Sequence, residues 1–125
     1  MESVDLYLIH TPLGGGKEAR LAQYRALVEC QRLGLATSIG VSNYGIAHLQ
    51  EIEDAGLPLP AANQLEIHPM CQKPELLAFM AGKGIPAIAY SSLAPLSNWA
   101  TRTHNQRTRC ATSGLPSGHK RPVYP

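Results

Sequence analysis

Polar side chains that can bind or react with a ligand follow four apolar segments of this 125-residue sequence. They are His10, Ser42–Asn43, Gln64 with Glu66 and His68, and Tyr90–Ser91 with Ser92. An imidazole, hydroxyls, carboxamides and a phenol supply both hydrogen-bond donors and acceptors. Taken singly, each has a structural interpretation as a strand end, a helix cap or polar packing. Because all four occur at equivalent positions, we predict that they share one ligand-binding face.

The elements that must position these side chains alternate between two periods. Residues 4–9, 38–41, 62–67 and 85–90 are short runs typical of strands, and the first of them is predicted to be buried. Helix-period segments separate them, beginning at Lys17, near Ser42 or Asn43 as a cap, and at Pro74. Glycines 34, 56 and 84 are expected to end these helices. Alternating β/α units predict an α/β fold with four parallel strands, whose functional groups gather at the strands' C-terminal ends.

Motifs for several other chemistries are missing from the sequence. It contains no HExxH, no paired His ligands and no GxSxG, so we expect no metal site. Gly14–Gly16 lacks the Lys-Ser/Thr of a P-loop and is interpreted as a flexible connection. His68, past the third predicted strand, is interpreted as structural.

The last 25 residues differ in character from the rest. Residues 101–125 are polar and carry five basic residues and no acid, although the whole chain has a net charge of only +2. Such a segment buries too little apolar surface to offset its ordering entropy. We predict two parts, a domain over 1–100 and a disordered basic tail over 101–125. As a nucleic-acid arm the tail lacks interleaved aromatics, so a solvated tail is favoured.

The sequence shows no pattern of a targeting signal. The first residues show no basic region followed by an apolar stretch, as a signal peptide would. The longest apolar runs fall short of the roughly 20 residues that a membrane helix needs. We therefore expect a cytoplasmic protein without membrane contact.

Four segments of the chain resemble aldo-keto reductases, in the same order and spacing. Residues 5–12 (DLYLIHTP) resemble the family's DLYLIHWP, and residues 39–44 (IGVSNY) resemble IGVSNF. Residues 63–69 (NQLEIHP) resemble NQVEYHP, and residues 89–93 (AYSSL) resemble AYSPLG. The resemblance covers about residues 3–98. It implies the fourth to seventh units of a (β/α)8 TIM barrel.

The resemblance also implies an activity and site residues. The family reduces aldehydes or ketones to alcohols by hydride transfer from NADPH, with NADH as the alternative, and without a metal. Of its catalytic Asp, Tyr, Lys and His, only the His is present, as His10. The implied cofactor residues are Ser42, Asn43 and Gln64 at the nicotinamide carboxamide, Tyr90 stacked on the ring, and Ser91 and Leu93 along the pyrophosphate.

Departures from the family pattern limit this reading. Only nine residues precede His10, and no tyrosine matches the context of the family's general acid. A TIM barrel needs about 250 residues. Three explanations stay open: a fragment from an incomplete gene model, a truncated product with a frame-shifted tail, or a half-barrel that self-associates through its open edges. The alternative function is a non-catalytic nucleotide-binding or interaction module.

Overall fold

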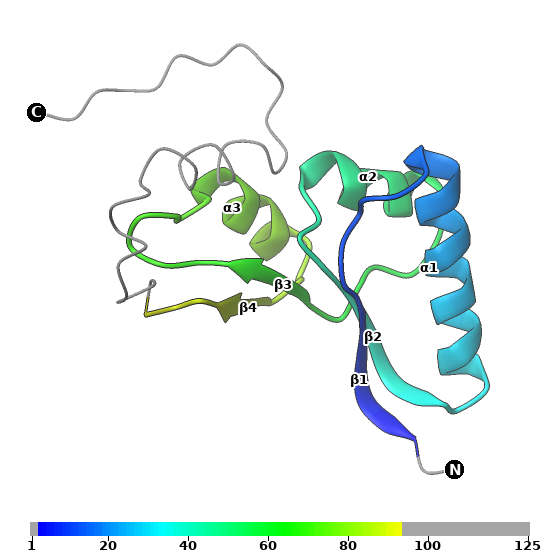
Figure 1. Ribbon diagram of the computed structural model, residues 1–125. Helices are drawn as coiled ribbons and strands as arrows, with labels where there is room; N and C mark the ends of the chain where they lie inside the picture. The colour runs from blue at the N-terminus through cyan, green and yellow to red at the C-terminus, as the bar shows by residue number, and fades with distance from the viewer. Residues whose placement is uncertain (1–2, 94–125) are drawn as a thin grey trace, which may run out of the picture.

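The computed structural model describes residues 3–93, so the predicted basic tail over 101–125 lies outside the described residues. Strands and helices alternate along the chain (Figure 1). Their bounds are β1 Val4–Ile9, α1 Gly16–Arg32, β2 Ala36–Ser42, α2 Ile46–Asp54, β3 Asn63–Glu66, α3 Pro74–Gly82 and β4 Ala87–Tyr90. The predicted order of elements is confirmed.

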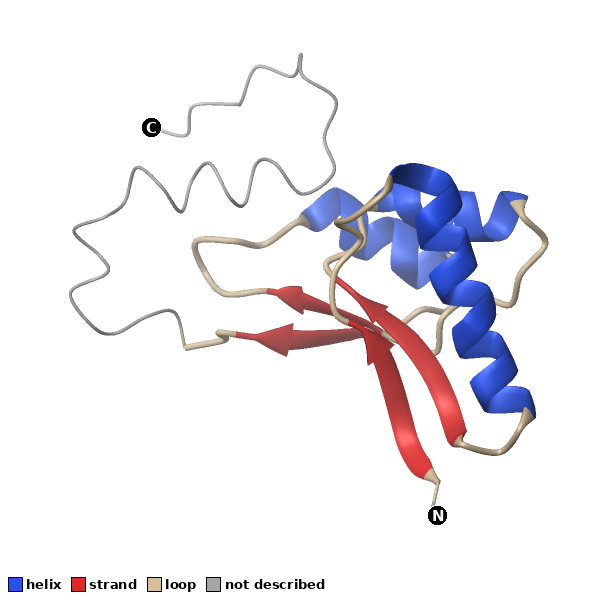
Figure 2. Ribbon diagram, turned by 45° about the vertical axis from the view of Figure 1, so that its right-hand side comes forward, coloured by secondary structure: helices blue, strands red, loops and turns tan. Residues whose placement is uncertain are grey.

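The four strands form one parallel sheet in the order β1-β2-β3-β4. All three helices lie on one face of this sheet (Figure 2). Sequential parallel strands with every helix on one side are the arrangement of a barrel wall, in which the helices form the outer layer. The predicted α/β class with four parallel strands and intervening helices is therefore confirmed.

The apolar core lies between the helices and the sheet. Tyr24 on α1 is fully buried, and its hydroxyl donates to the Pro58 carbonyl oxygen at 2.9 Å, so its polar end is satisfied. The other large buried side chains come from every layer and include Leu27, Ile39, Val41, Leu49, Ile52, Leu65 and Met80. This core fixes which face of each strand points toward the helices. Among the described residues, no helix is long and apolar enough to cross a bilayer.

Strand β1 is the element that the sequence misjudged. We predicted a buried strand, yet Val4 is 47% and Tyr7 55% exposed. Within the described residues β1 pairs only with β2 and lies at the edge of the sheet. Its apolar composition matches a strand with neighbours on both sides, whereas within residues 3–93 it has a neighbour on one side.

Helix ends follow the predicted backbone chemistry. Gly34, Gly56 and Gly84 have positive φ values of 72°, 65° and 69°, each one residue beyond a helix C-cap. Glycine adopts this left-handed conformation without a Cβ penalty and so ends helices. Pro74 occupies the first turn of α3, as predicted.

The predicted cap of α2 is wrong. We expected Ser42 or Asn43, but the N-cap residue is Gly45. Ser42 still belongs to β2, and its hydroxyl donates to the Gln64 carbonyl oxygen at 2.9 Å. The hydroxyl is thus used between strands and is not available to the helix.

Gly40 on β2 gives a test of the packing in this sheet. A Cβ at this position would lie 2.5 Å from the Ala62 carbonyl oxygen and 2.7 Å from Leu8 Cδ2. The backbone atom cannot yield cheaply, so Gly40→Ala should lower the free energy of unfolding by about 1–3 kcal/mol. Urea denaturation of the two chains measures the difference.

Gly82 is the matched control, because a Cβ there meets nothing within 4 Å and its φ is not positive. Gly82→Ala should be neutral or stabilising by up to about 1 kcal/mol, since alanine favours helix. An equal loss in both variants would contradict close packing at Gly40.

Candidate functional site

The sheet register brings the predicted site residues onto one face. Val41, Asn63 and Leu65 pack toward the helices and are essentially inaccessible. Since side chains alternate along a strand, Ser42 and Gln64 point to the opposite, helix-free face. They are also direct partners in the β2–β3 register. Gln64 and Ser42 therefore lie side by side at the C-terminal ends of their strands.

Tyr90 lies on the same helix-free face. It is the register partner of Glu66, which is two residues beyond Gln64 on β3 and so points the same way. Glu66 therefore shares this face with Gln64, as the period-two alternation of the strand predicts.

Hydrogen bonds join five of the predicted residues into one set, which we call the rim network: His10, Ser42, Asn43, Gln64 and Tyr90. Asn43 is at its centre. Its Nδ2 donates to the His10 carbonyl oxygen at 3.0 Å and to Ser42 Oγ at 3.1 Å. The Tyr90 hydroxyl donates to Asn43 Oδ1 at 2.8 Å. The network thus connects the ends of all four strands.

The backbone at Asn43 has the left-handed conformation, with φ 62°. Its N–H donates to the Gln64 carbonyl oxygen at 2.9 Å and holds the turn after β2 against β3. Asparagine tolerates this conformation better than most side chains do. The same residue therefore makes the turn and supplies the carboxamide of the rim network.

The network leaves a defined set of groups for a ligand. Both Asn43 amide hydrogens and the Ser42 hydroxyl hydrogen are used within the chain. Among the described contacts, one lone pair is then unused on Asn43 Oδ1 and one on Ser42 Oγ, although Ser42 is only 2% exposed. Both positions accept, so the site suits a ligand group that donates two hydrogen bonds, such as a primary amide.

The other predicted residues are placed less tightly. The His10 side chain is exposed at the end of β1, so only its backbone oxygen joins the rim network. Ser91, with φ 52°, and Leu93, which is 80% exposed, follow β4. They lie next in the chain after Tyr90, with their side chains open to solvent.

His68 is buried, and its imidazole lies next to the carboxylate of Glu66. Its Nδ1 accepts from the Met70 N–H at 3.2 Å, and its Nε2 lies 3.4 Å from Glu66 Oε1. This agrees with the predicted structural role of His68. Nearby, burial lowers the pKa of Lys73, and the charge of Glu66 opposes that shift. Among residues 3–93, no group of three or more His, Cys, Asp or Glu is placed to hold a metal ion.

Comparisons with known proteins give one consistent result. The model of the aldo/keto reductase family matches residues 1–115. An aldose reductase from Encephalitozoon cuniculi is 35% identical, with 86% of this chain and 42% of the relative covered. A D-galacturonate reductase from Fragaria ananassa is 40% identical, with 79% and 36% covered.

Solved structures agree with these relatives. An aldo/keto reductase from Brucella melitensis superposes with a TM-score of 0.71 at 34% identity, over 87% of this chain and 42% of that one. A second aldo-keto reductase, complexed with NADPH, has a TM-score of 0.67 at 26% identity, over 78% and 34%. The chain spans less than half the length of each of these four proteins.

The role of Asn43 as the centre of the rim network can be tested by replacing its hydrogen-bond donors with acceptors. Asn43→Asp keeps the acceptor for Tyr90 but replaces both N–H donors with an oxygen that faces the His10 carbonyl and Ser42 Oγ. We expect a loss of about 2 kcal/mol in the free energy of unfolding, since an acceptor then faces acceptors. Tyr90→Phe, which removes one hydrogen bond, should cost only about 1 kcal/mol. Denaturation curves compare the two, and a smaller loss for Asn43→Asp would contradict the network.

Proposed function

From the premise that this chain belongs to the aldo/keto reductase family, we propose that it forms the nicotinamide-binding wall of an NADPH-dependent carbonyl reductase. The supporting observation is the rim network, which gathers five residues on the helix-free face at the C-terminal ends of the strands. In barrels of parallel strands this end carries the active site. A structural relative at 26% identity is complexed with NADPH, which supports this choice of cofactor.

The groups of the rim network fit a nicotinamide carboxamide. Its two N–H donors match the open lone pairs of Asn43 Oδ1 and Ser42 Oγ, and its carbonyl oxygen matches the Gln64 side-chain amide. Tyr90 supplies an aromatic ring on the same face. Its hydroxyl is tied to Asn43, so the ring is held in place before a ligand arrives. Ser91 and Leu93 would follow the pyrophosphate.

When bound, NADPH would supply the hydride, and this chain's residues would orient its ring toward the carbonyl carbon of an aldehyde or ketone. His10 lies at the same end of the sheet, at the close of β1. A neutral imidazole N–H can donate to a carbonyl oxygen while negative charge develops there. We assign this orienting role to His10.

Proton donation is the step for which the described residues offer no counterpart to the family's tyrosine. Tyr7 lies inside β1, Tyr24 and Tyr44 are buried against the helices, and Tyr90 donates to Asn43. General acid catalysis typically supplies about 10²–10⁴-fold in rate. We therefore propose that this chain binds the cofactor and turns over little or no carbonyl substrate by itself. The alternative is a nucleotide-binding module without catalysis.

The edges of the sheet favour an assembly partner. Within residues 3–93, β1 and β4 each pair on one side only, and all strands of the sheet run in the same direction. β4 of one copy can therefore pair with β1 of a second, and a twofold arrangement would bring eight parallel strands together. We propose such self-association, which sedimentation velocity tests. A monomer at every concentration studied would rule it out.

Cofactor binding tests the proposed function directly. NADPH should bind the purified chain with a change in fluorescence, and Ser42→Ala and Gln64→Ala should each weaken binding about 3- to 10-fold, the worth of one hydrogen bond. Ser38→Ala is the matched control, because Ser38 lies on the same strand and face, about 13 Å from Ser42. It should bind as the parent does.

Two results would contradict these proposals. A chain that is folded by circular dichroism and shows no NADPH binding would overturn the nicotinamide site. Oxidation of NADPH by the purified chain with an aldehyde would overturn its catalytic incompleteness.

A further inference from the structure

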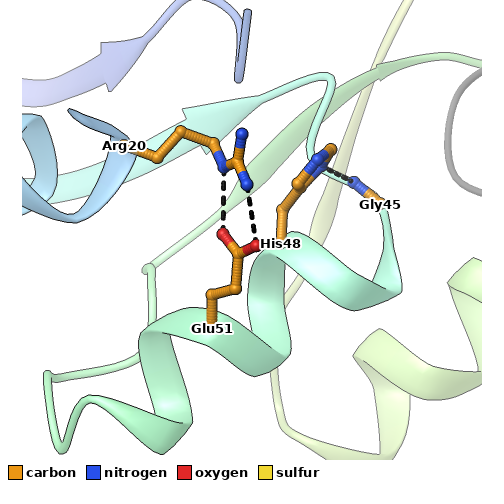
Figure 3. Close-up of polar contacts among 4 residues, drawn as sticks. All are labelled: Arg20, Gly45, His48 and Glu51. Carbon is orange, nitrogen blue, oxygen red and sulfur yellow. Dashed lines mark hydrogen bonds and ion pairs between the residues drawn. The ribbon is translucent and has the colours of Figure 1, made fainter. Parts of the chain in front are cut away.

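Helix α2 begins shortly after Ser42 at the end of β2 and Asn43 in the turn, and a histidine accepts a hydrogen bond from its N-cap residue. The N-cap is Gly45, which has no side chain to accept from the free N–H groups of the first turn. Instead, the side chain of His48, three residues later, accepts from the backbone of the N-cap residue. Its Nδ1 accepts from the Gly45 N–H at 3.2 Å (Figure 3). This is the half of a capping box that glutamate or glutamine usually provides.

The surroundings of His48 favour its neutral form. On one side Arg20 of α1 binds Glu51 of α2 through two hydrogen bonds of 2.9 and 2.7 Å, and His48 lies beside this pair (Figure 3). The Tyr44 ring meets the imidazole edge-on, with centroids 5.6 Å apart. Burial lowers the pKa of His48, the Arg20 charge adds to this, and the Glu51 charge opposes it.

The backbone connects His48 to the rim network over a very short path. Only Tyr44 separates Gly45 from Asn43, and Asn43 has the left-handed conformation that an unsupported chain rarely adopts. The Tyr44 backbone is fixed as well, because its N–H and its carbonyl oxygen both bond to the Asn63 side chain, at 3.4 and 2.9 Å. The Gly45 N–H is the next group along, and His48 is its acceptor.

We propose that neutral His48 is a positioning residue for the nicotinamide contacts of Ser42 and Asn43. The proposal rests on the proposed function and adds to it a dependence on the protonation of a residue outside the site. An imidazolium has no lone pair to accept the Gly45 N–H, and the Arg20 charge opposes its formation while the Glu51 charge favours it. Protonation therefore releases the start of α2 and loosens the turn that presents Asn43.

The direction of the pH effect follows from the lowered pKa. A histidine whose pKa is lower in the folded chain than in the unfolded one binds fewer protons when folded. Its contribution to stability is complete above the ordinary histidine pKa of about 6.5 and is lost as the pH falls below that value. Nucleotide affinity should fall at lower pH than this, where His48 becomes protonated in the folded chain.

Calorimetric titration of the full chain with NADP⁺ between pH 8 and pH 5.5 tests the proposal. His48→Gln retains a neutral acceptor at the same helix position, so it should keep the parent affinity at pH 8 and lose less at pH 5.5. The ratio of parent to His48→Gln affinity cancels the titration of the ligand's own phosphates. We expect this ratio to fall about 3- to 10-fold from pH 8 to pH 5.5.

His48→Ala completes the series, because it has no acceptor at any pH. It should bind weakly throughout, with no change in its ratio to His48→Gln. A parent-to-Gln ratio that is constant with pH, or an alanine variant that binds as tightly as the parent at pH 8, would overturn the proposal.

A measurement without nucleotide separates this proposal from the function on which it rests. In ¹⁵N NMR spectra, the parent should show an unprotonated His48 Nδ1 at pH 8, and hydrogen exchange at Gly45 should accelerate as that nitrogen titrates. If these signals do not move together, the positioning role is wrong while nucleotide binding can still stand. If they do move together but NADP⁺ fails to bind, the cap is supported and the proposed function is wrong.

Discussion

Asn43 places one carboxamide where the ends of β1, β2 and β4 converge. Its two donors and one acceptor meet a backbone oxygen, a hydroxyl and a phenol from those three strands, and its own backbone N–H reaches β3. Neighbouring parallel strands are joined by ladder hydrogen bonds along their length, but those bonds end where the strands end. The spacing of the polar groups beyond that point depends on Asn43.

The two faces of the sheet have different roles: one packs against the helices, and the other carries the candidate site. Burial of the apolar side chains between helices and sheet stabilises the sheet from one side. The same alternation of side chains that points Val41 and Leu65 toward the helices points Ser42 and Gln64 to the helix-free face, where Ser42 is still buried. A ligand site on this face therefore needs no separate scaffold, because its orientation follows from the packing of the core.

Local chemistry in the sequence predicted much of this arrangement. The confirmed predictions concern the four strands, the three helices, the glycines after the helix ends and the proline at the start of α3. Each of these depends on residues close by in the chain, so a single sequence is enough to predict it. The exposure of β1 could not be read this way. An apolar strand has the same sequence whether or not a neighbour covers it, so burial depends on tertiary structure.

The site was predicted as a set of residue types and not as a network. Placing His10, Ser42, Gln64 and Tyr90 at strand ends follows from period and topology, whereas the choice of Asn43 as their common partner depends on side-chain geometry. The cap of α2 was mistaken for a similar reason. Ser42 is a good cap by type, but the register of β2 and β3 directs its hydroxyl to Gln64.

The exposed edge of β1 has a consequence for the chain in solution. An edge strand offers unpaired backbone groups on its open side, and here Val4, Leu6 and Tyr7 add apolar surface beside them. Natural sheets usually protect such edges with charged residues, proline or a bulge, and β1 has only Asp5 among these. The strand that leads to His10 is thus an edge on which another strand can pair. How well the chain stays dispersed during expression and storage will depend on what pairs with it.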